Sequence, residues 1–224
     1  MKQNAGEYLK ATGVVAKKAL ILIGIKLFMV FFAALLFVSN VTLNVVFGIL
    51  VIAAECALLF VIGKGQARDE YKYVRINKST YPDGAPLSKK ARETSMVKAG
   101  IVAGTVVLFY SVFTLLGAIL PVSAGEGIAA RVVFQGIMKI GFSGITMICT
   151  GFGLTGNAEG APNVLVENGG VFFAFYFTGT VLVAAAYFVG YVLSARLRMR
   201  QHVEIQQEIK QFEDMGRIGR RGKK

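Results

Sequence analysis

The sequence predicts an all-α, polytopic integral membrane protein with four transmembrane helices and one re-entrant or interfacial amphipathic helix. Apolar residues make up 54% of the 224 residues and the mean hydropathy is +0.58, yet the net charge is +12. This combination is typical of a membrane protein whose basic residues lie in the loops between apolar helices. The two cysteines, Cys56 and Cys149, lie in separate apolar segments and match neither a disulfide framework nor a zinc site.

The first two predicted spans, at residues 19–38 and 45–63, form a hairpin around the polar turn at 39–44. Each apolar run approaches the ~20 residues that a helix needs to cross ~30 Å of hydrocarbon. Each run also contains one charged residue, Lys26 in the first and Glu55 in the second. At a rise of ~1.5 Å per residue, antiparallel helices would hold both charges roughly 10 to 12 Å from the same membrane face.

Two further spans are predicted at residues 97–120 and 169–193, so that residues 1–193 form a single transmembrane helical domain. Residues 64–98, between the second and third spans, are predicted to form a polar connector. Small residues at helical spacing let neighbouring helices approach closely, so glycines in these spans are expected to be packing points. The glycines chosen on this basis are Gly100, Gly104 and Gly179.

The last two predicted segments differ in character from the four spans. Residues 131–154 are apolar but interrupted by glycines, which predicts a helix that re-enters the membrane or lies along its surface. Residues 194–224 are predicted to form a cytoplasmic charged helix and a basic tail. Within this helix Ile205, Ile209 and Phe212 repeat at helical spacing and could dock on the connector or on a partner helix.

The distribution of basic residues predicts the orientation. The first 18 residues, the connector at 64–98 and the segment 194–224 together contain 22 of the 25 Lys and Arg residues. Because cytoplasmic segments of membrane proteins are rich in Lys and Arg, four spans with both termini in the cytoplasm place all 22 on one side. The expected location is therefore the plasma (cytoplasmic) membrane, with anionic lipids, rather than nucleic acid, as the partner of the basic tail.

Lys26 and Glu55 are the first candidate functional site. A charge in hydrocarbon is costly, so Lys and Glu residues there tend to pair or to face a cavity. One interpretation is an ion or proton site near the cytoplasmic end of the bundle. The favoured interpretation is a structural pair, or a Lys26 side chain that extends to the membrane interface, because one pair without further carboxylates makes a poor relay.

A polar stripe in the 131–154 segment is the second candidate. Its members are three or four residues apart, which places them on one face of a helix. They are Gln135, Lys139, Ser143, Thr146 and Thr150. The stripe could line a polar pathway. The favoured interpretation is structural, with the stripe facing water or its hydroxyls bonded to carbonyl oxygens one turn earlier in the same helix.

The motifs give no indication of an enzyme, a cofactor or a metal site. Residues 151–156 match G-x-G-x-x-G, but an apolar membrane segment precedes them and a loop follows, so a dinucleotide site is not expected.

Two functional classes follow. The favoured class is a non-catalytic subunit or scaffold of a membrane protein assembly, with protein partners or further copies of the chain in the membrane. The alternative is a small transporter or channel subunit that uses the two candidate sites.

Overall fold

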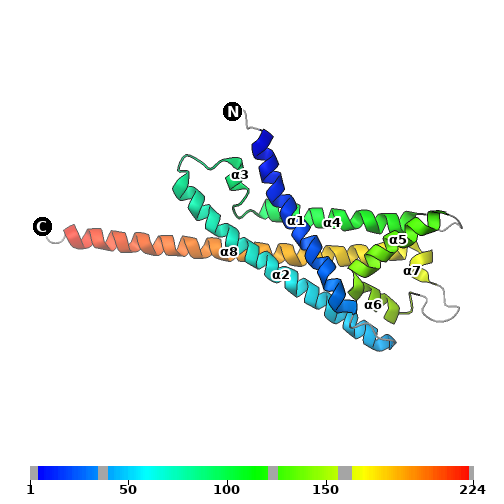
Figure 1. Cartoon of the computed structure of the whole chain (residues 1–224). Helices are drawn as coiled ribbons and strands as arrows, with labels where there is room; N and C mark the ends of the chain where they lie inside the picture. Colours follow the sequence, from blue (N-terminus) through cyan, green and yellow to red (C-terminus); the bar gives the residue numbers. More distant parts are fainter. Residues whose placement is uncertain (1–4, 35–39, 121–125, 156–162, 222–224) are drawn as a thin grey trace.

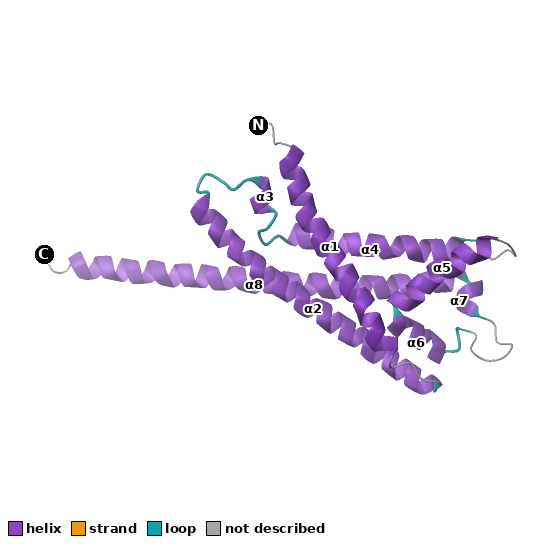
Figure 2. Cartoon of the chain, in the orientation of Figure 1, coloured by secondary structure: helices purple, strands orange, loops and turns teal. Residues whose placement is uncertain are grey.

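The computed structural model describes residues 5–34, 40–120, 126–155 and 163–221. Within these ranges all regular secondary structure is helical, in agreement with the predicted all-α class (Figures 1 and 2). The helices are α1 (Ala5–Ala34), α2 (Val41–Thr80), α3 (Leu87–Lys90), α4 (Met96–Ile119), α5 (Glu126–Gly141), α6 (Ser143–Gly151), α7 (Val164–Glu167) and α8 (Gly169–Arg221).

The long helices α2, α4 and α8 form the body of the molecule. α8 packs along both α2 and α4, and α1 packs mainly against α4 and α3 (Figure 1). In the described part of the chain, α2, α4 and α8 are the three single helices that are long and apolar enough to cross a membrane. They contain the predicted spans at 45–63, 97–120 and 169–193, apart from the last residue of the second range.

The predicted first span, at residues 19–38, and the amphipathic helix are not confirmed. The apolar part of α1 from Ala19 to Ala34 is short for a membrane span, and residues 35–38 of the predicted span lie outside the described residues. The 131–154 segment is not one helix but two, because α5 and α6 meet at an angle of 99°. By length and composition, this bent pair could form a fourth, broken span or a re-entrant loop.

Two of these three long helices continue beyond the predicted ends of their apolar runs. α2 extends to Thr80, so the first half of the predicted polar connector is helical. It stops just before Pro82, which cannot donate a backbone hydrogen bond and disfavours helix in the residue before it. α8 extends to Arg221 and contains 53 residues.

Glycines allow the closest helix crossings. A Cβ atom on Gly63 of α2 would collide with the backbone of Tyr187 in α8, and one on Gly190 of α8 would collide with the backbone of Phe60 in α2. At the crossing of α2 and α6, a Cβ on Gly48 would lie 2.7 Å from the carbonyl oxygen of Gly144. The crossings therefore bring main chains into contact, as in other small-residue interfaces between membrane helices.

One end of the bundle collects the basic segments and is called the basic end below. It contains the start of α1, the connection between α2 and α4 and the C-terminal part of α8 (Figure 1). α5, α6 and α7 lie toward the opposite end (Figure 1). The arrangement agrees with the separation of charge along the sequence.

Candidate functional site

A buried cluster of charged and polar side chains connects four helices at the basic end, and Glu70 of α2 is its centre. Glu70 is only 5% exposed. Its carboxylate forms ion pairs with Lys18 of α1 and with Lys98 of α4, whose Nζ lies 2.8 Å from Oε2. The hydroxyl of Tyr191 in α8 donates a hydrogen bond to the same oxygen. The cluster therefore joins α1, α2, α4 and α8 through one carboxylate.

The lysines of this cluster outnumber its carboxylate. Lys98 also donates to the carbonyl oxygen of Ala91 at 3.0 Å and to that of Glu93, so it ties the segment before α4 to the cluster. Two ammonium groups nevertheless share Glu70, and both are largely buried. Burial, and next the positive charge of Lys98, lower the pKa of Lys18 to about 7. The cluster therefore retains an excess of positive charge whenever both lysines are protonated.

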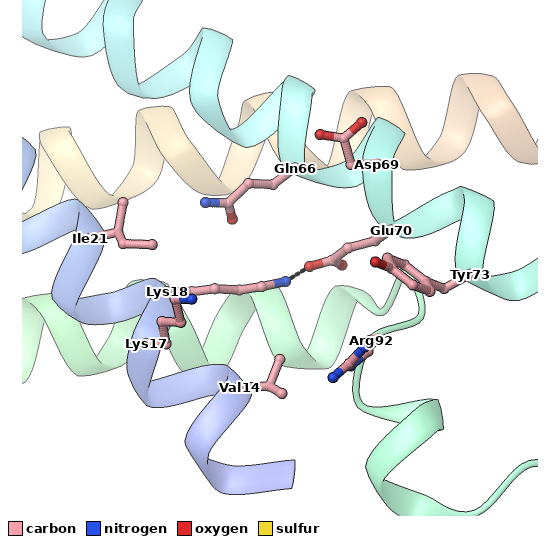
Figure 3. A pocket seen from close by; sticks show the side chains of 9 residues that line it. All are labelled: Val14, Lys17, Lys18, Ile21, Gln66, Asp69, Glu70, Tyr73 and Arg92. Atoms are coloured by element: carbon pink, nitrogen blue, oxygen red, sulfur yellow. Dashed lines mark ion pairs between the residues drawn. The ribbon is translucent and has the colours of Figure 1, made fainter. Parts of the chain in front are cut away.

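A pocket of about 400 Å³ lies beside this cluster, between α1, α2 and the segment that follows α3 (Figure 3). Its charged lining residues come from three separate segments. Its lining consists of Val14, Lys17, Lys18, Ile21, Gln66, Asp69, Glu70, Tyr73 and Arg92. Pockets of this size accommodate small molecules or lipid headgroups.

Lys26 and Glu55 lie deeper in the bundle and face each other. Lys26 is 2% exposed and Glu55 is 4% exposed, and Lys26 Nζ lies 2.7 Å from Glu55 Oε2. The same ammonium lies 3.9 Å from the centre of the Phe142 ring, close enough for a cation–π interaction. Two cavities border Lys26, and each has a volume of about 10 Å³. A volume of this size holds at most about one water molecule.

The predicted polar stripe does not form one continuous helix face, because the bend at Phe142 divides it between α5 and α6. Thr146 bridges the bend: its Oγ1 lies 2.8 Å from the carbonyl oxygen of Lys139 and 2.8 Å from the Tyr176 hydroxyl. Thr150 donates to the carbonyl oxygen of Thr146, one turn earlier. The two hydroxyls therefore form hydrogen bonds with backbone carbonyl oxygens, and that of Thr146 also bonds to Tyr176 of α8.

The remaining members of the stripe lie in different surroundings. Gln135 is buried, and its Nε2 donates to the carbonyl oxygens of Gly117 at 3.0 Å and Leu165 at 3.3 Å, which caps the end of α4. Lys139 is half-buried. Ser143 Oγ is buried and has no hydrogen-bond partner.

Of the three glycines expected to pack helices, the structure places one in a close contact. A Cβ on Gly179 would lie 2.9 Å from the Ile145 side chain. A Cβ on Gly100 would make an ordinary contact of 3.8 Å with Phe188, and one on Gly104 would have no atom within 4 Å. Gly104 is exposed and makes no close helix contact within the described chain. α4 packs instead through the face that carries Ala99 and Ala103, both buried.

The Glu70 cluster and its pocket were missed by sequence reasoning. Glu70 lies in the segment assigned to the polar connector, where a carboxylate among many lysines and arginines has no distinctive spacing. Lys18 precedes the apolar run of α1, and Lys98 immediately follows the predicted start of the third span. Lys18 and Lys98 both lie at the boundary of an apolar run, where a charged side chain can reach the end of a neighbouring helix. This position was the one feature of the sequence that could have indicated the cluster.

Fold and site together define an all-helical protein with three helices long and apolar enough to cross a membrane and a buried ion cluster at one end of the bundle. No family model, curated protein or solved structure matches the chain.

Proposed function

We propose that this protein is a non-catalytic subunit or scaffold of a membrane protein assembly, and that the end of α8 attaches it to a partner. The observation that carries the proposal is the length of α8. Its 53 residues correspond to about 80 Å of helix, against about 30 Å for the hydrocarbon core of a bilayer. The final part of α8, residues 205–221 and called the arm below, extends beyond the other helices (Figure 1).

A helix that stands apart from its own bundle lacks the main source of helix stability in proteins, which is the packing of an apolar face. The arm has residues suited to such packing, because Ile205, Ile209 and Phe212 recur at helical spacing in its sequence. A partner helix or groove that covers these residues would stabilise the arm. The length of the arm and its apolar residues favour an attachment segment over a solvated tail.

The transporter alternative has weaker support. A transport pathway needs polar groups that can exchange partners with a passing ion or solute. Lys26 and Glu55 are bonded to each other, and Thr146 and Thr150 are bonded to backbone oxygens. The cavities of about 10 Å³ beside Lys26 are also too small for anything beyond about one water molecule.

The proposal includes an orientation. Lys and Arg residues are enriched on the cytoplasmic side of plasma membrane proteins, so the basic end and the arm are assigned to the cytoplasm. A partner of the arm would then be a cytoplasmic protein or the cytoplasmic part of another membrane subunit.

Gel electrophoresis under native conditions, on membranes of the cells that make the protein, tests the proposal. The full chain is expected to migrate in a complex much larger than its own 24.1 kDa. The triple change Ile205→Ser, Ile209→Ser and Phe212→Ser should shift it to a smaller species, because the apolar face of the arm is lost.

The matched control replaces the polar side of the same segment, with Gln206→Ser, Gln207→Ser and Gln211→Ser. This control should leave the large complex intact. Migration of the unaltered chain at its own mass would overturn the proposal. An equal loss of the complex in the control would also overturn the proposal. It would show that the complex does not depend specifically on the apolar residues of the arm. The mass of the complex formed by the purified protein, without other proteins, distinguishes a complex of identical copies from a complex with another protein.

A further inference from the structure

The pocket beside Glu70 has free positive charge, while its negative charge is already engaged. Glu70 is paired with Lys18 and Lys98 and accepts from Tyr191. Asp69 lies 3.2 Å from Lys72, with which it forms an exposed ion pair. The carboxylates of the pocket therefore offer little to a cationic ligand.

Two cations of the pocket are without a partner in the described part of the chain. Lys17 of α1 and Arg92, after α3, are both exposed, and the side chain of neither forms an ion pair or hydrogen bond there. Lys17 lies next to Lys18 on α1, whereas Arg92 comes from the segment that follows α3, across the pocket from α1 (Figure 3). An anion placed between them would meet two separate positive groups without displacing an existing contact.

Uncharged donors of the pocket add to this positive lining. The side-chain oxygen of Gln66 accepts from the Tyr187 hydroxyl at 2.8 Å, which leaves the Gln66 amide nitrogen available as a donor. The phenol of Tyr73 also lines the pocket. Lysine, arginine and neutral N–H or O–H donors are the groups that bind phosphate oxygens in proteins, with arginine able to bind two oxygens at once.

The pocket also has an apolar rim. Val14 and Ile21 of α1 line it, and Ile21 is 42% exposed. The adjacent Leu20 is 67% exposed and belongs to the apolar part of α1 that begins directly after Lys18. The positive groups therefore lie where an apolar helix surface begins, which is the level at which lipid headgroups meet acyl chains.

From these observations we infer that the pocket formed by Lys17, Lys18 and Arg92 binds a negatively charged phosphate group, with an anionic phospholipid as its source. The phosphate lies between Lys17 and Arg92, and the acyl chains run along the exposed apolar surface of α1. The site is independent of the proposed attachment by the arm, which lies on a different helix. It adds a specific lipid site to the general attraction between a basic surface and an anionic membrane.

Native mass spectrometry of the detergent-purified full chain tests this inference. The probes are short-chain phosphatidylglycerol, which carries a net negative charge, and phosphatidylcholine with the same acyl chains, which carries none. The full chain should retain one phosphatidylglycerol in preference to phosphatidylcholine. The double variant Lys17→Gln with Arg92→Gln should lose about tenfold or more in phosphatidylglycerol affinity, as expected when two basic groups near a headgroup are removed.

A control variant removes the same kinds of charge from α2 outside the pocket, with Lys64→Gln and Arg75→Gln. Both residues are exposed, and neither lines the pocket. This control should bind phosphatidylglycerol like the unaltered chain. An equal loss in both double variants would overturn the inference, because binding would then depend on net charge alone. Unchanged binding by the Lys17 and Arg92 variant would overturn it as well.

Competition identifies the source of the phosphate. Glycerol phosphate at millimolar concentration carries the headgroup chemistry without acyl chains. If it fails to displace phosphatidylglycerol, the site recognises a lipid. If glycerol phosphate displaces the lipid from the full chain, the phosphate site is supported, and a soluble phosphate compound can occupy it without acyl chains. The single variant Arg92→Gln, at an exposed position, should give a smaller loss of affinity and provides a second measurement should the double variant fold poorly.

Discussion

Lys26 has its charge satisfied by two neighbours. Its ammonium contacts Glu55 on one side and the Phe142 ring on the other. In an apolar interior the energy of each charge depends on the presence of its partner, since neither can be solvated by water. The pair is therefore expected to behave as a unit when either residue is changed.

Replacing one member of the pair should destabilise the protein more than replacing both. Lys26→Met or Glu55→Met leaves a buried charge without its partner, which costs about 3 to 5 kcal/mol in comparable cases. The double variant should recover most of this loss. Unfolding of the purified chain by denaturing detergent provides the measurement, with Lys64→Met, an exposed position, as control.

Equal stabilities of the two single variants and the unaltered chain would show that the residues do not depend on each other. The double variant also separates the two functional classes. A scaffold should retain its native-gel complex without the pair, whereas a transporter that uses the pair should lose transport although it folds.

Sequence alone predicts a site best where a residue differs in polarity from the residues around it in the chain. Lys26 and Glu55 are single charges in long apolar runs, so the sequence alone singles them out as candidates for one buried site. Glu70 is one charged residue among many, and its burial depends on α1, α4 and α8 converging on it. No local pattern contains that information.

At the scale of single helices, the same limitation applies to glycine. Gly63, Gly104 and Gly190 all lie in apolar helical sequence, but only Gly63 and Gly190 face another main chain. The spacing of small residues is common in apolar helices and does not state which face meets a neighbour. The spacing therefore did not show that Gly104 lies on a face without a close contact in the described chain.

Replacing Gly190 by Ala should therefore destabilise the bundle, while Gly104→Ala should not. The new Cβ at 190 would overlap the backbone of Phe60, which cannot move away as a flexible side chain could. Overpacking of this kind costs about 1 to 3 kcal/mol. At 104 the methyl group meets open space, and alanine should favour the helix by up to about 1 kcal/mol. Thermal unfolding in detergent measures both; a lower stability for Gly104→Ala would contradict the assignment of faces.

The bend between α5 and α6 was also beyond sequence reasoning. Polar residues from Gln135 to Thr150 keep a regular helical spacing, which predicts one continuous helix. Glycines occur at several positions in the same stretch, so the sequence does not state where a break falls. In the structure the helix breaks at Phe142, whose buried ring packs against Lys26 and Tyr110. At the break the Thr146 hydroxyl donates a hydrogen bond to the carbonyl oxygen of Lys139.

For the whole molecule, α2, α4 and α8 alternate in direction (Figure 1), so if all three cross a membrane, the connection between α2 and α4 and the end of α8 lie on the same side. This result does not depend on whether α1 crosses the bilayer, but a full crossing by the bent pair, which lies between α4 and α8 in the sequence, would place the end of α8 on the opposite side. The proposed orientation assigns the shared side to the cytoplasm.

Single cysteines test this topology in intact cells. Cysteine at Lys78 or at Gln207, both exposed at the basic end, should be protected from a thiol reagent that cannot cross membranes. Cysteine at Phe152, which is 65% exposed at the end of α6, should be labelled. The unaltered chain, with Cys56 and Cys149, provides the background. Labelling at only one of positions 78 and 207 would contradict the arrangement of the three helices, and labelling at both would reverse the orientation.

The position of Glu70 has a consequence for the order in which the protein is made. Its partners are encoded before it in Lys18, after it in Lys98, and far later in Tyr191. A ribosome that has synthesised α1 and α2 has produced the carboxylate and only one of these partners. The second ion pair of Glu70 forms only after α4 has been made, and the hydrogen bond from Tyr191 only after α8 has been made. Docking of the last helix completes the network around Glu70, so maturation of the bundle depends on the final quarter of the chain.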